Sequence, residues 1–360
     1  MSFYPNEGEP LWSKYSTEAV MHTMEVYSKY SFDYPYPTAQ SVNGPVGGME
    51  YPMITFNGPR TELEDDGSRT YSRSEKEFLI GVVIHEIGHI YFPMIVNSDE
   101  RQWTWMDEGL NTFLQYLAEQ EWDINYRSDR GEPRWITNYM SSNNQVPIMT
   151  NSESLLQFGN NAYAKPATAL VVLRETILGR ELFDQAFKEY SERWKFKRPT
   201  PYDFFRTMEE ASGVDLDWFW RGWFYTTDVT DIGIKSVKKY AVKKGENAIE
   251  FIEDSSEGLG FSQKQNKYHY EITYDKPGGL VMPIIVEFNY TDGTKERKTY
   301  PAQIWRYNDK EVTKVFSSDK EIQSIVIDPD LETADVDTSN NSFPKEETNK
   351  FDKFKNKIKG

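Results

Sequence analysis

A chain of 360 residues can bury a sizeable core and favours two domains over one. Aromatic residues make up 15% of it, which excludes a disordered chain, and its formal charge of −16 disfavours nucleic acid and anionic lipid as partners. With no cysteine, the chain has neither disulfides nor thiolate chemistry, so any metal must be held by imidazole and carboxylate groups.

The first ten residues have neither a basic start nor an apolar run, and nowhere do roughly 18 uncharged apolar residues follow one another. We therefore expect the chain as given to be soluble, without a signal or a membrane segment. Its compartment and its oligomeric state stay open.

The first two thirds of the chain predict helices around one extended stretch. Apolar residues at helical spacing predict a helix over 17–30, which stops before Tyr34-Pro35-Tyr36-Pro37. Residues 41–56 then read as extended. Further helices are predicted at 106–122, 166–178 and 181–193, and one more begins at Thr200-Pro201.

Another helix is expected to begin at Ser74, whose hydroxyl can form a capping box with Glu77. It continues through residues 78–84 into His85 and is apolar on every face, so we expect it to be buried. Pro93 should kink or end it.

The pattern changes to alternation and short apolar runs in residues 227–331. Strand-like runs at 267–274 and 283–290, the second followed by a turn at Asp292-Gly293, predict a small β-sandwich. The polar, lysine-rich residues 332–360 predict a flexible tail.

The segment His85-Glu86-Ile87-Gly88-His89 is the strongest chemical signal in the chain. On a helix, residues four apart share one face, so both imidazoles can point a nitrogen at one ion about 2.0–2.1 Å away. A catalytic zinc ion takes three protein ligands and keeps an open position for water. Glu108, separated from His89 by 18 residues, is the best third ligand because a loop and a returning helix fit in that gap. The sequence thus predicts one Zn²⁺ site.

The alternative interpretation is that this His-Glu pair is an accidental surface or core feature. Two of only four histidines in the chain lie in the motif, on a helix too apolar to bury imidazoles without a partner, which favours the metal. The other two, His22 and His269, we interpret as structural or exposed.

These residues carry a family resemblance. The motif at 85–89, the 18-residue gap and Trp105-Met106-Asp107-Glu108-Gly109 together resemble the gluzincin aminopeptidases, the family of alanyl aminopeptidase and leukotriene hydrolase. Gly47-Gly48-Met49-Glu50-Tyr51 is similar to the family's Gly-x-Met-Glu-Asn exopeptidase strand, with Tyr51 in place of Asn. Tyr163-Ala164-Lys165 is similar to its Tyr-x-Lys-Gly segment, with Pro166 in place of Gly. The resemblance covers roughly residues 15–225.

The resemblance implies an α+β fold, with a thermolysin-like, largely helical zinc peptidase domain over residues 1–226. It implies that Glu86 is the general base toward a zinc-activated water and that Tyr163 stabilises the oxyanion of the tetrahedral intermediate. It also implies a substrate-binding strand made of Gly47, Gly48, Met49 and Glu50, in which Glu50 binds the free α-ammonium of the peptide.

The expected function is therefore a zinc aminopeptidase acting on peptides with a free N-terminus. Because Tyr51 departs from the exopeptidase strand, an endopeptidase or an epoxide hydrolase on the same zinc site is the first alternative. The second is a truncated, catalytically impaired peptide-binding fragment, because the chain has no room for the family's N-terminal β domain. The presence of Glu86 argues against this second alternative, since a structural zinc site needs no base.

Overall fold

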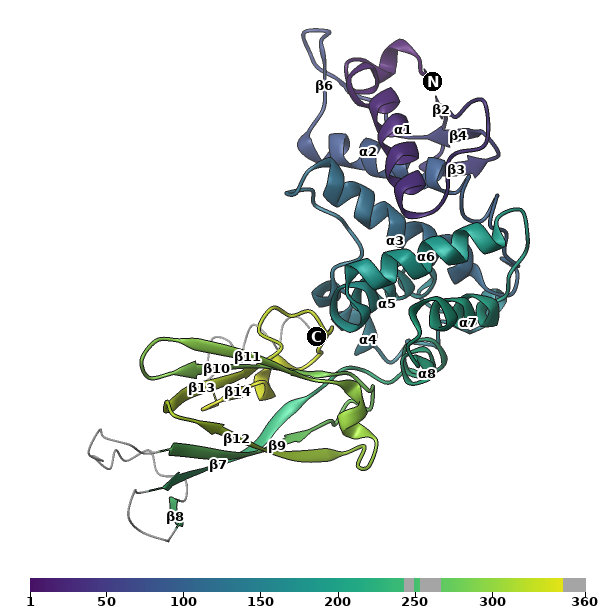
Figure 1. Ribbon diagram of the computed structural model, residues 1–360. Coiled ribbons are helices and arrows are strands. Elements are labelled where there is room, and N and C mark those ends of the chain that lie inside the picture. Colours follow the sequence, from purple (N-terminus) through teal and green to yellow (C-terminus); the bar gives the residue numbers. More distant parts are fainter. Residues whose placement is uncertain (243–248, 253–266, 346–360) are drawn as a thin grey trace. The chain divides into compact units, whose positions relative to one another are not determined.

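The computed structural model describes residues 1–242, 249–252 and 267–345, and the chain divides between Thr227 and Asp228 into two compact units (Figure 1). Helices and a small sheet make up the first unit, and the second is built almost entirely of strands (Figure 1). The chain is thus of the α+β class.

The helices of the first unit pack against one another and against the small sheet. They are α1 (Leu11–Tyr30), α2 (Arg73–Gly88), α3 (Thr104–Trp122), α4 (Thr137–Met140), α5 (Lys165–Val172), α6 (Arg180–Trp194), α7 (Pro201–Ser212) and α8 (Asp217–Tyr225). Single π-helical segments, Gly159–Ala164 and Leu173–Leu178, precede and follow α5.

The sheet of the first unit places one short strand beside α2. Its order is β1 (Ser2–Phe3), β2 (Gln40–Asn43), β4 (Ile54–Asn57) and β3 (Gly48–Tyr51). The first three strands run parallel, whereas β3 pairs antiparallel with β4 and forms the end of the sheet. Both β3 and β4 pack on α2. An end strand keeps one row of backbone groups available for pairing with an extended chain.

Helix α2 begins two residues earlier than its sequence predicts. The sequence holds two overlapping Ser-x-x-Glu patterns, and the capping box forms with Ser72 and Glu75, not with Ser74 and Glu77. The earlier box satisfies the free N–H groups of a longer helix. The expectation that every face is buried was also wrong, because the Phe78 side chain is 49% exposed. The helix ends at Gly88, before Pro93.

An aromatic core holds the start of α3 in place. The Trp105 ring stacks on Phe205 with 5.9 Å between centroids and meets the edge of Phe224 at 4.8 Å. Trp105 is fully buried in this cluster. Aromatic pairs of this kind contribute about 0.5–1.5 kcal/mol beyond the burial of their area. The cluster therefore anchors α3 on α7 and α8, three residues before Glu108.

The described residues of the second unit form two antiparallel sheets of four strands each. One has the order β12 (Glu311–Ser318), β9 (Lys267–Asp275), β7 (Gly233–Val242) and β8 (Ile249–Ile252). The other has the order β11 (Lys295–Tyr300), β10 (Ile284–Tyr290), β13 (Ile322–Ile327) and β14 (Ser342–Phe343). The two sheets contact through Phe288 and Phe316, whose rings stack at 4.0 Å. The strands and the hairpin predicted around Asp292-Gly293 are confirmed.

The stretch after residue 331, expected to be a flexible tail, belongs in part to this second unit. β14 pairs with β13, and Thr333 is buried. The Asp335 carboxylate accepts hydrogen bonds from the backbone N–H groups of Ile232 and Asp337. Polar side chains of this stretch form hydrogen bonds inside the unit, so a polar composition did not mean that the stretch is mobile. Residues 346–360 lie outside the described residues.

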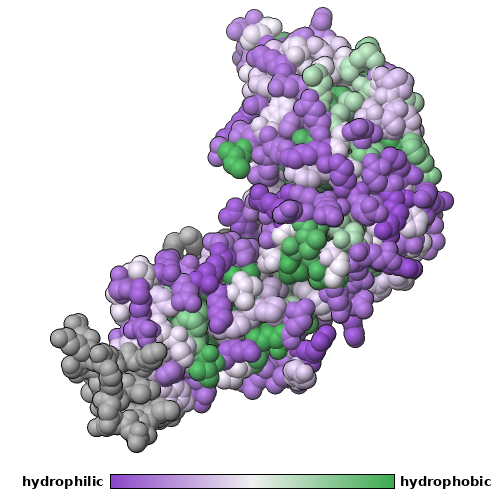
Figure 2. Space-filling model, viewed as in Figure 1, coloured by the Kyte–Doolittle hydropathy of each residue, from purple (hydrophilic) through white to green (hydrophobic). Residues whose placement is uncertain are grey.

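Hydrophilic side chains predominate on the face of the molecule shown in Figure 2, and hydrophobic residues form only small separate patches there. Within the described ranges, no helix is both long enough and apolar enough to cross a bilayer.

Candidate active site

Helices α2 and α3 bring the three predicted metal ligands together. His85 lies in the last turn of α2, and His89 follows as its C-terminal cap with helical backbone angles, φ −59° and ψ −19°. Both rings therefore stay on one face of the helix. The two helices cross closely at Gly88, where a Cβ atom would lie 2.2 Å from Oδ1 of Asn111. Glu108 is the fifth residue of α3 and thus lies in its second turn.

The ligand atoms have the spacing that a tetrahedral ion requires. Nε2 of His85 and Nε2 of His89 lie 3.1 Å apart, and each lies 3.2–3.3 Å from Oε2 of Glu108. Ligands at 2.0–2.1 Å from a tetrahedral zinc ion are separated from one another by about 3.3–3.4 Å. The lone pairs of two imidazole nitrogens and of a carboxylate oxygen repel one another unless a cation lies between them. These donors fit a zinc ion.

Oxygen atoms of other residues accept from Nδ1 of both imidazole rings or lie close to it, and so orient the rings. Nδ1 of His85 lies 2.8 Å from Oε1 of Gln115. Nδ1 of His89 lies 2.9 Å from the carbonyl oxygen of Phe92 and 3.0 Å from Oδ1 of Asp107. Such partners hold Nε2 ready to coordinate a metal. Sequence reasoning did not identify them as partners, although Gln115 has the helical spacing that places it on the same face of α3 as Glu108.

Glu86 is buried beside the ligands and lacks a partner for one oxygen. Its side chain is 5% exposed, and Oε2 has no hydrogen-bond partner among the described residues. Burial is the main cause that raises the pKa of this carboxyl group to about 8, and the carboxylates of Glu50 and Glu108 add to the effect. A dication in the same site acts in the opposite direction and favours the carboxylate. Glu86 is therefore suited to accept a proton, and its protonation state depends on whether the ion is bound.

Strand β3 places Glu50 toward the same site. Ligand-type oxygens of Glu50 and Glu86 and a nitrogen of His89 lie within 4.8 Å of one another. Alternation along the strand puts Gly48 on the same face as Glu50 and puts Met49 on the other, where its side chain is 40% exposed. Gly47 has open space around its Cβ position. Of the predicted substrate-binding residues, the fold thus brings Gly48 and Glu50 to the site, and the Met49 side chain points away from it.

Tyr163 contacts two of the three predicted metal ligands, Glu108 and His85. Its hydroxyl donates a hydrogen bond of 2.5 Å to Oε1 of Glu108, and its ring stacks on His85 with 5.8 Å between centroids. Burial, followed by the charge of Glu108, raises the pKa of the Tyr163 phenol above its usual range. In its neutral form the phenol is a hydrogen-bond donor.

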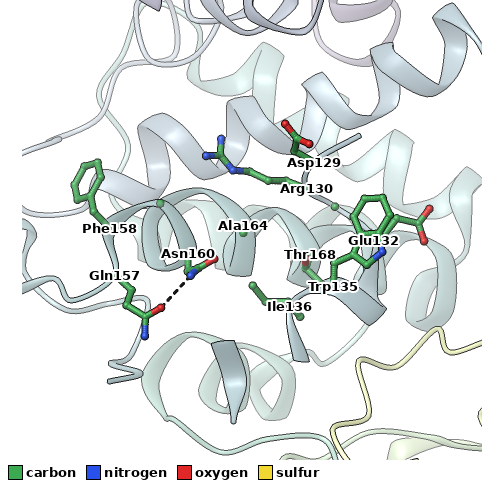
Figure 3. Close-up of a pocket in the computed structure, with 12 residues that line it drawn as sticks. Asp129, Arg130, Glu132, Trp135, Ile136, Gln157, Phe158, Asn160, Ala164 and Thr168 are labelled. Carbon is green, nitrogen blue, oxygen red and sulfur yellow. Dashed lines mark hydrogen bonds between the residues drawn. The ribbon is translucent and has the colours of Figure 1, made fainter. Parts of the chain in front are cut away.

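Arg130 and Phe158 help to line a cavity (Figure 3), which has a volume of about 400 Å³. Two residues that line it contact the Tyr163 ring: the Arg130 guanidinium lies 4.5 Å above its centroid, and Phe158 meets it edge-on at 5.9 Å. None of the three predicted metal ligands lines this cavity. The cavity is therefore separate from the cluster of predicted ligands.

Two imidazoles from one helix, a carboxylate from the next helix and a buried carboxyl group beside them form the arrangement found in metallopeptidases. Comparison with known proteins agrees: the peptidase family M1 domain matches residues 15–223. The chain belongs to this family of metallopeptidases, and the resemblance to the gluzincin aminopeptidases is confirmed.

Relatives of this chain include several aminopeptidases. Aminopeptidase M1-A of Oryza sativa subsp. japonica is 22% identical over 71% of this chain, which corresponds to 30% of the relative. Glutamyl aminopeptidase of Sus scrofa is 27% identical over 65% of this chain and 26% of the relative. The solved structure of Legionella pneumophila aminopeptidase A in complex with aspartic acid has a similar fold, with a TM-score of 0.63 and 14% identity. That match covers 92% of this chain and 36% of the other, so the chain spans about a third or less of these proteins.

Proposed function

We propose that this chain carries the catalytic centre of a zinc aminopeptidase, in a thermolysin-like unit that is followed by the β-sandwich. The observation that supports this most is the convergence of Nε2 of His85, Nε2 of His89 and Oε2 of Glu108 to 3.1–3.3 Å. These three residues would hold one zinc ion. When bound, the ion acts as a Lewis acid and lowers the pKa of a water molecule toward about 7.

The chain's own residues supply the proton transfer and the oxyanion contact. Glu86 takes the proton of the attacking water, because its buried Oε2 has no competing hydrogen bond from the residues that the structure describes. The Tyr163 hydroxyl, which donates to Glu108 in the absence of substrate, donates to the oxygen of the scissile carbonyl as charge develops there. Both groups are buried or half-buried, so these interactions take place away from bulk water.

Glu50 makes the enzyme an exopeptidase. A peptide that pairs with the free edge of β3 brings its α-ammonium group to the Glu50 carboxylate, which lies within 4.8 Å of ligand-type atoms of Glu86 and His89. A carboxylate at this distance from the catalytic groups leaves room for a single residue before the cleaved bond. The substrates are therefore peptides with a free N-terminus.

The test combines metal analysis with matched reporter peptides that differ only in N-acetylation. We expect zinc at one equivalent, cleavage of the free-amine peptide and no cleavage of the acetylated one. The Glu50→Gln variant should raise KM for the free-amine peptide by the equivalent of roughly 2 kcal/mol, the low end for a charge pair, because Glu50 is only half-buried.

Equal cleavage of both peptides by the parent protein would replace this proposal with an endopeptidase. Zinc binding without turnover on any reporter would favour a peptide-binding fragment.

A further inference from the structure

A chain of buried polar groups extends from His85 away from the metal ligands. Oε1 of Gln115 lies 2.8 Å from Nδ1 of His85, and Nε2 of Gln115 donates to Oε1 of Glu119 at 2.8 Å. The other oxygen of Glu119 accepts from the Ser128 hydroxyl. Glu119 is 5% exposed and Ser128 is 3% exposed. None of these groups touches the site where substrate is expected.

Glu119 decides which way the Gln115 amide points. The atoms facing Nε2 of Gln115 are Oε1 of Glu119 and, at 3.4 Å, the carbonyl oxygen of Gly81, and both are acceptors. The amide must therefore present its NH₂ group to Glu119 and its oxygen to His85. An oxygen at that position can only accept, so Nδ1 of His85 carries the proton. Nε2 then keeps its lone pair for the ion.

Glu119, a residue of α3, packs against α2, the helix that bears His85. A Cβ atom at Gly81 would lie 3.0 Å from Oε1 of Glu119, so the carboxyl group fills the space that this glycine leaves. Gly81 and His85 are one helical turn apart. Glu119 is therefore held by the same helix whose histidine it orients.

We propose that Glu119 is a positioning residue of the metal site, which selects the coordinating tautomer of His85 through the amide of Gln115. This inference rests on the proposed function, since it takes His85 to be a zinc ligand. An acceptor at the Oε1 position of Glu119 is what the role requires. A glutamine at 119 can also supply it, with its NH₂ group turned to the Ser128 hydroxyl.

Substitutions at positions 115 and 119 test whether the hydrogen-bond acceptor at position 119, and not the size of its side chain, is what the metal site needs. Gln115→Leu should weaken zinc binding by about 10–100-fold and Glu119→Leu by about 10-fold, the range for the loss of an outer partner of a ligand. Glu119→Gln should bind zinc nearly as the parent does. The exchanged pair Gln115→Glu with Glu119→Gln should also bind zinc nearly as the parent does. In that variant the carboxylate at position 115 accepts from Nδ1 of His85, and the amide at position 119 donates to this carboxylate. Glu121→Gln, an exposed change on the same helix, is the control.

Zinc affinity is measured on the full chain by competition with a chromogenic chelator, with circular dichroism as the check of folding. The second measurement is the ¹⁵N spectrum of histidine-labelled, zinc-loaded protein, in which only four histidines occur. The parent and the exchanged pair should show His85 protonated and hydrogen-bonded at Nδ1, and Glu119→Leu should lose that slowly exchanging proton.

Parent-like zinc affinity in a folded Glu119→Leu variant would overturn the inference, as would an equal loss in Glu119→Gln and Glu119→Leu. The His85→Ala variant shows whether the positioning role alone is wrong or whether the ligand assignment is wrong as well. If it loses zinc while the Gln115 and Glu119 variants do not, the ligand assignment stands and the positioning role is wrong. If His85→Ala itself binds zinc as the parent does, the ligand assignment is wrong.

Discussion

Gly48 on β3 lies so close to Glu86 on α2 that a Cβ atom at position 48 would be 2.0 Å from Oε1 of Glu86 and 2.8 Å from a methyl group of Val82. Only a residue without a side chain lets the end strand approach the helix to this distance. The glycine that precedes Met49 and Glu50 therefore sets how far Glu50 and Glu86 are from each other.

Gly48→Ala should push either the strand or the Glu86 carboxylate aside. We expect kcat/KM to fall by about 100-fold, because a displacement of roughly 1 Å at a catalytic group has that effect. Zinc content should stay unchanged, since the three ligands lie on other elements. Gly47→Ala is the matched control, because nothing lies within 4 Å of its Cβ position. Equal kinetics of the two variants would show that the close approach has no catalytic role.

Glu86→Gln should keep the metal and lose turnover by about 10²–10⁴-fold, the usual contribution of a general base. The amide has the shape of the carboxylate but cannot accept the proton of the attacking water. Zinc content and reporter hydrolysis are measured on the same preparation. A zinc-loaded variant with near-parental turnover would mean that another group is the base.

Tyr163→Phe should lower kcat by about 10²–10³-fold and leave KM nearly unchanged, because the hydroxyl binds the developing oxyanion more strongly than the ground-state carbonyl. The variant also removes the hydrogen bond to Oε1 of Glu108, so zinc affinity is measured alongside. An unchanged kcat at full zinc occupancy would leave Tyr163 with a structural role.

Glu119 should make the stability of the first unit depend on pH. Burial is the main cause that raises its pKa from 4.5 to about 7; Ser128, Gln115 and Arg130 oppose the shift, and Asp129 adds to it. The folded state thus binds the proton more tightly than the unfolded state. The stabilising contribution of the protonated group is complete below about pH 4.5 and is lost as pH rises through about 7.

Glu119→Gln resembles the protonated form and does not titrate. Its advantage in free energy of unfolding over the parent should therefore grow between pH 5 and pH 8, to on the order of 1–3 kcal/mol. Urea unfolding with a chelator present, followed by tryptophan fluorescence, measures this, because nine of the ten tryptophans lie in the first unit. A difference that is constant across this range would contradict the raised pKa.

The features that the sequence predicted correctly are those that follow from local periodicity. His85 and His89 share a face because a helix repeats every 3.6 residues, and the strands at 267–274 and 283–290 follow from alternation. The same locality explains a failure: two Ser-x-x-Glu patterns overlap at the start of α2, and both satisfy the local rule. Only the structure shows that the earlier one, Ser72 with Glu75, forms the cap.

The sequence by itself indicated which residues can hold a zinc ion, because the two histidines lie within one helix turn and Glu108 follows after a gap of 18 residues. Only the tertiary structure decided that Gln115 and Glu119 stand behind His85, that Gly48 must lack a side chain, and that Thr333 and Asp335 are packed and not mobile. Each of these features depends on contacts between elements that are far apart in the chain. The sequence pattern of one segment shows which of its faces is apolar, but it does not show which other segment packs on that face.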